Sequence, residues 1–126
     1  MMSYEKWRDA IVDAVRNIAS RSFQEQAWFP GGSVVSSPDE VYLVLMEDST
    51  FDLFFDTYGK QFTPQQVQAW QDLRSLLTAY YDKLPAHPDA HQVLNDPAWD
   101  LVRQSASQFV RVFKQLDDLP IGSSPS

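Results

Sequence analysis

The residues of this chain that could do chemistry are mostly carboxylates, and they gather in one third of the sequence. Seven acidic residues and no Lys or Arg lie between Ser22 and Gly59, and the whole chain carries a net charge of −7. Three of these acids, Asp48, Asp52 and Asp56, are four residues apart, which would place them on one face of a helix. Like charges at that spacing repel by about 0.2–0.5 kcal/mol per pair. A solvated face tolerates this cost, so the acids indicate either an ordinary surface or a site for a positively charged ligand.

A basic protein is the partner that fits this charge best, because opposite charges steer and orient association. Nucleic acid fits poorly, since phosphate binding needs clustered Lys and Arg. A divalent cation would find oxygen ligands here, but the glycine-containing pattern of a calcium loop is missing. The residues expected to meet a basic partner are Glu47, Asp48, Asp52 and Asp56.

An aromatic pair near the acids could anchor such an interface. Trp28 and Phe29 precede the turn signal Pro30-Gly31-Gly32 and follow no apolar stripe, so we expect them to be partly exposed. Aromatic side chains contribute strongly to binding energy at interfaces, which adds Trp28 and Phe29 to the predicted partner-binding residues. The alternative is that the pair forms a loop plug that closes the core.

No other constellation in the sequence points to catalysis or to a metal. His87 and His91 are four residues apart with Asp89 between them, but the glutamate base and the third ligand of a zinc site are missing. The sequence has no Gly-x-Ser-x-Gly elbow, no glycine-rich phosphate loop and no cysteine, so it offers no thiolate ligand either. We therefore expect a non-catalytic protein with no cofactor and no bound metal.

The elements that must position these residues are helices, because helix-start signals recur along the chain. Ser37–Glu40 and Thr63–Gln66 each place a hydroxyl at the N-cap, proline at the first helical position, and Glu or Gln three residues after the cap. Ser3 and Asp96-Pro97 give similar starts, whereas Ser22–Val35 is expected to be a loop. The predicted helices cover Tyr4–Ser20, a segment from Pro38 that breaks near Asp48-Ser49, Phe51–Tyr58 with Gly59 as a left-handed C-cap, Pro64–Lys83, and Pro97 to about Leu116.

The acidic segment, Ser36–Gly59, mixes its acids with apolar residues, so it must bury one side and keep its charges on the other. The side chains counted in its apolar set are Val41, Leu43, Val44, Leu45, Phe51, Leu53, Phe54 and Phe55. Residues 41–45 could instead be a buried strand, since periodicity alone does not separate a short strand from a buried helix. The capping signals before them favour a helix.

These helices predict an all-α fold, a compact bundle of about five helices, with a small α+β fold that uses 41–45 as a strand as the alternative. Residues 1–118 would form a single helical domain and residues 119–126, rich in Pro, Gly and Ser, a flexible C-terminal tail. The longest apolar run, Val41–Met46, is far below the roughly 20 residues of a membrane span, and no signal peptide is visible. A cytoplasmic protein without a membrane partner is expected.

The chain also resembles a known group of proteins. The residues that carry the resemblance are Val35–Glu40, Glu47–Phe54, Asp96–Trp99, Val102, Arg103 and Ala106. In these positions the chain is similar to small bacterial immunity proteins encoded in polymorphic-toxin and contact-dependent inhibition loci. The resemblance implies a compact, acidic, cytosolic protein that neutralises a cognate toxin by direct binding. The alternative function is a self-associating structural or scaffold domain, which would form a homo-oligomer.

Overall fold

The computed structural model describes residues 3–29, 31, 35–85 and 88–118, and every regular element among them is helical. The elements are α1 (Tyr4–Ala19), α2 (Arg21–Ala27), α3 (Pro38–Leu43), the π-helical turn η1 (Val44–Asp48), α4 (Phe51–Tyr58), the 3₁₀ turn η2 (Gly59–Gln61), α5 (Pro64–Asp82), α6 (Ala90–Leu94) and α7 (Pro97–Asp118). The predicted all-α fold is confirmed, and residues 41–45 are helical, so the strand alternative is wrong.

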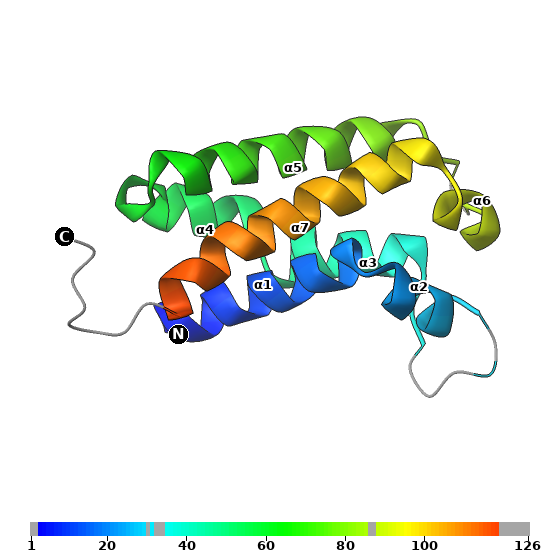
Figure 1. Cartoon of the computed structure of the whole chain (residues 1–126), viewed down its shortest axis with the longest axis horizontal. Helices are drawn as coiled ribbons and strands as arrows, with labels where there is room; N and C mark the ends of the chain where they lie inside the picture. Colours follow the sequence, from blue (N-terminus) through cyan, green and yellow to red (C-terminus); the bar gives the residue numbers. More distant parts are fainter. Residues whose placement is uncertain (1–2, 30, 32–34, 86–87, 119–126) are drawn as a thin grey trace.

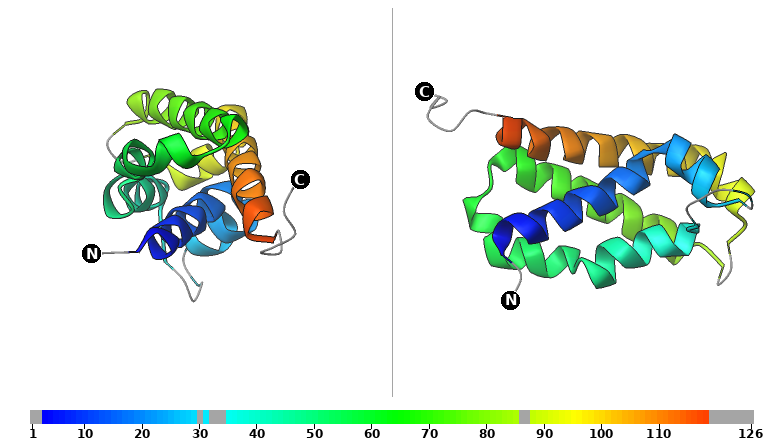
Figure 2. Two further views of the ribbon diagram at one scale, coloured as in Figure 1. Left: turned by 90° about the vertical axis from the view of Figure 1, so that its left-hand side faces the viewer. Right: turned by 90° about the horizontal axis from the view of Figure 1, so that it is seen from below.

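Four long helical segments build the bundle, and each runs antiparallel to the one before it in the chain (Figure 1). They are α1, the end-to-end series α3–η1–α4, α5 and α7. Seen along its long axis, the molecule has α5, α7, α1 and the α3–η1–α4 series arranged in a ring around the core (Figure 2). The short helices α2 and α6 cap one end. Helix α7 makes the most extensive contacts, packing between α1 and α5.

The core forms because each long helix carries an apolar stripe at helical spacing. Helix α1 buries Ile11, Val15 and Ile18, and α7 buries the stripe that begins at Trp99 and ends at Phe113. An aromatic cluster fills the core toward the end of the bundle where η2 lies, with the ring centroid of Phe55 within 6 Å of several others (Figure 1). Such edge-to-face and stacked pairs add to the stabilisation from burial alone.

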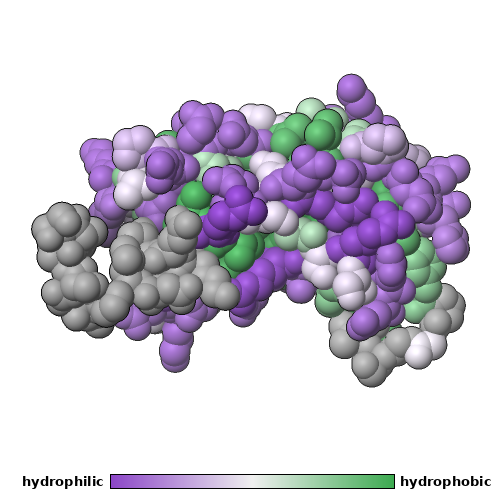
Figure 3. All heavy atoms as spheres, viewed as in Figure 1, coloured by the Kyte–Doolittle hydropathy of each residue, from purple (hydrophilic) through white to green (hydrophobic). Residues whose placement is uncertain are grey.

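The face that α1, α5 and α7 present in Figure 1 is mostly hydrophilic, and apolar atoms reach it in separate patches between the helices (Figure 3). The exposed Leu101 of α7 lies in the groove between α5 and α7. Isolated apolar patches of this kind are normal on the surface of folded proteins. Among the described residues, no helix is long and apolar enough to cross a membrane.

The capping hydrogen bonds predicted at Ser3, Ser37 and Thr63 are present, whereas Thr50 makes no side-chain capping bond at the start of α4. The Ser3 and Ser37 hydroxyls accept hydrogen bonds from the backbone N–H of Lys6 and Glu40 at 3.2 and 3.0 Å. At the start of α5 both halves of a capping box are present: Thr63 Oγ1 accepts from Gln66 N–H, and Gln66 Oε1 accepts from Thr63 N–H. These bonds satisfy amides that the first helical turn leaves without partners.

Two local predictions are wrong. The segment 22–35 was expected to be a loop, but its first part is α2, which Ser20 caps by accepting from Phe23 N–H at 3.0 Å. The apolar stripe of this helix is hard to recognise because one of its buried residues, Gln24, is polar. Gly59 is not a left-handed cap: its φ is −57°, and the chain continues directly into η2.

The break expected near Asp48-Ser49 is present and is sharper than a kink. Residues 44–48 form a π-helical turn, and Thr50 then adopts a left-handed conformation with φ 47°. The predicted C-terminal tail and His87 lie outside the described residues.

Candidate functional site

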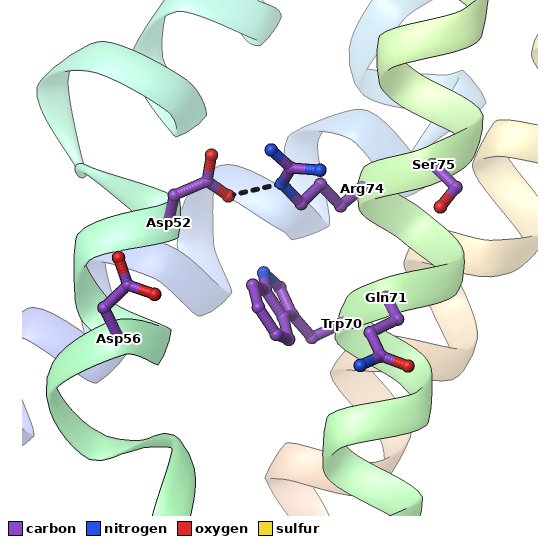
Figure 4. A pocket seen from close by; sticks show the side chains of 6 residues that line it. All are labelled: Asp52, Asp56, Trp70, Gln71, Arg74 and Ser75. Atoms are coloured by element: carbon purple, nitrogen blue, oxygen red, sulfur yellow. Dashed lines mark hydrogen bonds and ion pairs between the residues drawn. The ribbon is translucent and has the colours of Figure 1, made fainter.

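The structure brings together only part of the predicted acidic set. Asp52 and Asp56 lie one turn apart on α4 and both point toward α5 (Figure 4). Glu47 and Asp48 are exposed on η1, one turn earlier in the chain, and do not line the pocket that Asp52 and Asp56 share. The π turn and the break at Thr50 therefore divide the acids between two neighbouring surfaces.

Asp52 has a partner that sequence spacing did not reveal. Arg74 of α5 donates from Nε to Asp52 Oδ1 at 2.8 Å, and both side chains are nearly half exposed. This hydrogen bond, with the nearby carboxylate charges of Asp52 and Asp56, raises the pKa of Arg74 above its usual value. The two residues are 22 positions apart, so only the packing of α4 beside α5 makes them neighbours.

A pocket of about 340 Å³ opens beside this ion pair, between α4 and α5 (Figure 4). We call it the α4/α5 pocket. Its lining residues are Asp52, Asp56, Trp70, Gln71, Arg74 and Ser75. Two carboxylates against one guanidinium leave the pocket with a net negative charge, so its chemistry suits a positively charged group.

Trp70 supplies the aromatic wall of the α4/α5 pocket. One face of its indole stacks on Phe55, with ring centroids 4.5 Å apart and an interplanar angle of 6°. The indole N–H is buried and has no acceptor among the described residues. Figure 4 shows the nitrogen-bearing edge of the ring turned toward the Asp52–Arg74 pair.

Of the two predicted aromatic anchors, Trp28 is buried and Phe29 is half buried. Trp28 is only 8% exposed and packs against Trp99 with ring centroids 6.0 Å apart, so the prediction that it is partly exposed is wrong. The cause is α2, which folds this part of the chain back over the core. Phe29 is half buried against the ring of His91, 4.3 Å away. The alternative expectation, a plug that closes the core, describes Trp28.

The acidic segment instead exposes two leucines. Leu43 at the end of α3 is 39% exposed and Leu53 on α4 is 54% exposed. Both belong to the apolar set expected to be buried. Their exposure follows from helical periodicity, because Leu43 lies two residues from buried Val41 and Leu53 lies two residues from buried Phe51, which places each leucine on the opposite side of its helix. The acidic segment therefore exposes apolar side chains as well as the acids Glu47 and Asp48.

The junction between η1 and α4 is held by a side chain from α1. The indole N–H of Trp7 donates to the backbone carbonyl of Ser49 at 2.8 Å, and Ser49 itself is buried. Ser49 N–H in turn donates to the carbonyl of Val44, the i to i−5 bond that closes the π turn. π turns are frequent at functional sites, and residues other than glycine in the left-handed backbone conformation also cluster there.

A second polar cluster lies inside the bundle, where α2 meets α6 and α7. Gln24 is fully buried, and its Oε1 accepts from Trp99 Nε1 at 3.1 Å and from Arg103 Nη1 at 3.0 Å. Arg103 also donates to the carbonyl of Leu94 at 3.0 Å. The partners of this cluster are protein atoms, so it joins helices and offers no free group to a ligand.

In the described ranges, no group of three or more His, Cys, Asp or Glu residues is arranged to hold a metal ion. His91 is exposed at the start of α6, where its ring lies against Phe29.

Comparisons of the chain with family models, with curated proteins and with solved structures find no match.

Proposed function

We propose that this protein is a non-catalytic binding protein that docks a basic protein partner on its acidic segment. The observation that carries the proposal is the combination of exposed leucines with exposed acids on a segment that contains no Lys or Arg. Interfaces typically have apolar groups at their centre and polar groups at the rim. Leu43 and Leu53 would supply the apolar contacts, and the neighbouring carboxylates would supply the rim.

The charge of this surface favours association with a basic protein. The acidic segment holds six of the acids, Arg74 neutralises one of them through its bond to Asp52, and the whole chain keeps a net charge of −7. A field of one sign raises the rate of encounter with an oppositely charged partner and disfavours like-charged ones. The resulting association would weaken as salt is added, because exposed charges are screened over about 8 Å at physiological ionic strength.

The backbone of the acidic segment supports a binding role independently. Thr50 is β-branched and left-handed, a conformation that costs about 1–3 kcal/mol and is retained mainly where the surroundings enforce it. Trp7 supplies that enforcement through its bond to Ser49. The strained junction holds Leu53 and Asp56 on a rigid helix instead of on a loop, which suits a preformed docking surface.

The resemblance to immunity proteins suggests what the partner would be. A toxin domain that acts on nucleic acid needs a basic surface for phosphate, and an acidic inhibitor could cover that surface. In this proposal the protein masks the basic face of a toxin and performs no reaction of its own.

Charge reversal tests the proposal. Asp48, Asp52 and Asp56 are changed together to Lys, and affinity is measured for the protein that copurifies with this chain or is encoded beside it, between 50 and 500 mM salt. We expect affinity to fall at least about tenfold and its salt dependence to decrease.

The matched control uses Glu5, Asp9 and Asp13, which are exposed and repeat the same four-residue spacing on α1. Their change to Lys alters the net charge equally and should have a much smaller effect on affinity. Binding that is unchanged by the first triple variant and insensitive to salt would contradict the proposal.

A further inference from the structure

The α4/α5 pocket already holds one guanidinium group, that of Arg74. It enters from α5 and meets the carboxylate of Asp52 on α4 through a single N–H···O bond of 2.8 Å. One side of the pocket is thus already formed by a guanidinium paired with a carboxylate. A second arginine, from another protein, would meet the same groups.

The charges of the pocket are not balanced by Arg74. Asp56 lines the pocket, is exposed, and has no hydrogen bond or ion pair among the described residues. Its carboxylate offers two acceptor oxygens to an incoming cation, the arrangement that a planar guanidinium binds in a bidentate manner. Asp52 also keeps one oxygen that does not bond to Arg74.

Trp70 gives the pocket its preference for a flat cation. Its indole lines the pocket while one face packs on Phe55. Guanidinium groups bind aromatic surfaces by cation–π attraction and by stacking, and tryptophan is the strongest aromatic partner. The buried indole N–H, which lacks an acceptor, lies at the edge turned toward the Asp52–Arg74 pair. It would gain a possible acceptor in Asp52 if Arg74 moved away.

The Asp52–Arg74 pair is weak enough to be exchanged. Its two side chains are 42% and 46% exposed, and ion pairs this exposed stabilise a protein only slightly. An incoming guanidinium that bonds to Asp56 and stacks on Trp70 can replace it without disturbing the core.

We propose that Arg74 is an internal occupant of the α4/α5 pocket and that an arginine side chain of the partner displaces it. The inference rests on the proposed function for the source of that arginine, a basic protein. It assigns Asp56 and Trp70 as the recognition residues and Arg74 as an internal competitor that lowers affinity.

The test uses a small probe, N-acetyl-arginine methylamide, with the citrulline analogue as its neutral control of the same shape. Binding is followed by nitrogen–proton NMR through the Trp70 indole N–H and the Arg74 Nε–H. The arginine probe should shift the indole signal and weaken the Arg74 Nε–H signal as its bond to Asp52 is lost. The citrulline probe should do neither.

Two variants with the same net charge then separate competition by Arg74 from a general effect of charge on probe binding. Arg74→Gln should bind the arginine probe about 2- to 5-fold more tightly, the range set by an exposed ion pair. Arg111→Gln makes the same change in net charge on the exposed surface of α7, away from the pocket, and should bind as the wild type does. Asp56→Asn should bind severalfold more weakly than the wild type.

The inference is overturned if Arg74→Gln binds no more tightly than Arg111→Gln, or if the citrulline probe causes the same shifts. In that case the proposed function still holds if charge reversal weakens binding of the protein partner. Conversely, the expected probe results, with no effect of charge reversal on the partner, would show an arginine-binding pocket that the partner does not use. They would reject both the proposed function and the partner as the source of the arginine.

Discussion

At the residue scale, Gln24 shows how one buried amide can connect three helices. Its Nε2 donates to the carbonyls of Asn17 and Ile18, two of the acceptors that the end of α1 leaves without helical partners. Its Oε1 accepts from Trp99 and Arg103 of α7. Both ends of the amide are thus satisfied, which is the condition for a stable buried polar group.

Replacing Gln24 by Met, which has a similar volume but no amide, should lower the free energy of unfolding by about 2–4 kcal/mol. The change leaves the Trp99 N–H and one Arg103 N–H buried without an acceptor, and unsatisfied groups cost about 1–3 kcal/mol each. Urea denaturation measures the loss. Gln26→Met on the exposed side of the same helix is the control and should change stability by less than about 0.5 kcal/mol.

Gln24 also explains why one helix, α2, could not be predicted from the sequence. The helix starts at Ser3, Ser37, Thr63 and Asp96 could be predicted because each depends on side chains within three residues of the cap. Helix α2 could not, because a buried Gln interrupts its apolar pattern. The Asp52–Arg74 pair could not be predicted for a different reason: nothing local relates two residues on separate helices.

At the element scale, the broken helix α3–η1–α4 separates Asp52 and Asp56, which line the α4/α5 pocket, from Glu47 and Asp48, which do not. Even an unbroken helix would not place the whole apolar set on one face, because successive residues advance by about 100°. The π turn and the left-handed Thr50 rotate α4 relative to α3. The break near Asp48-Ser49 could be predicted from the sequence, and the exposure of Leu43 and Leu53 follows from their positions within α3 and α4. The angle between α3 and α4 could not be predicted, because it depends on packing against α1, whose Trp7 bonds to the carbonyl of Ser49 at the junction.

Thr50→Gly should raise the free energy of unfolding by about 1 kcal/mol. Glycine relieves about 1–3 kcal/mol of left-handed strain and costs about 0.5–1 kcal/mol in backbone entropy. The side chain of Thr50 makes no capping bond that would be lost. Thr57→Gly, inside α4, is the matched control and should be destabilising, because Thr57 is helical. Equal destabilisation by both changes in thermal unfolding would refute the presence of strain at Thr50.

At the scale of the whole molecule, α5 is the helix that joins the acidic segment to the rest of the bundle. The Tyr81 hydroxyl donates to the backbone carbonyl of Pro38 at the start of α3. The neighbouring Tyr80 hydroxyl donates to Asp96 Oδ2 at 2.9 Å, just before α7. Two adjacent tyrosines of α5 therefore hydrogen-bond to the segments on either side of it, one at the start of α3 and one just before α7. This arrangement makes the stability of the domain depend on both phenols staying protonated.

That dependence predicts a loss of stability in alkali. Burial, and the nearby charge of Asp39, raise the pKa of Tyr81, while burial and the bond to Asp96 raise that of Tyr80. Below pH 10, near the usual tyrosine pKa, folded and unfolded chains both keep these protons, and the stabilisation is complete. Above it the unfolded chain releases protons that the folded chain retains, so stability falls, by up to about 1.4 kcal/mol per pH unit for the more buried Tyr81 and by less for the more exposed Tyr80.

Tyr81→Phe isolates one of the two contributions. The variant loses its bond to Pro38, so it should be about 1 kcal/mol less stable at pH 8. Between pH 10 and 11.5, however, its free energy of unfolding should decline less steeply than that of the wild type, by about 1.4 kcal/mol per pH unit. Lysines titrate in the same range in both proteins, so their effect cancels in the comparison. Urea denaturation at each pH gives the two slopes, and parallel declines would show that Tyr81 ionises equally easily in the folded and unfolded chains.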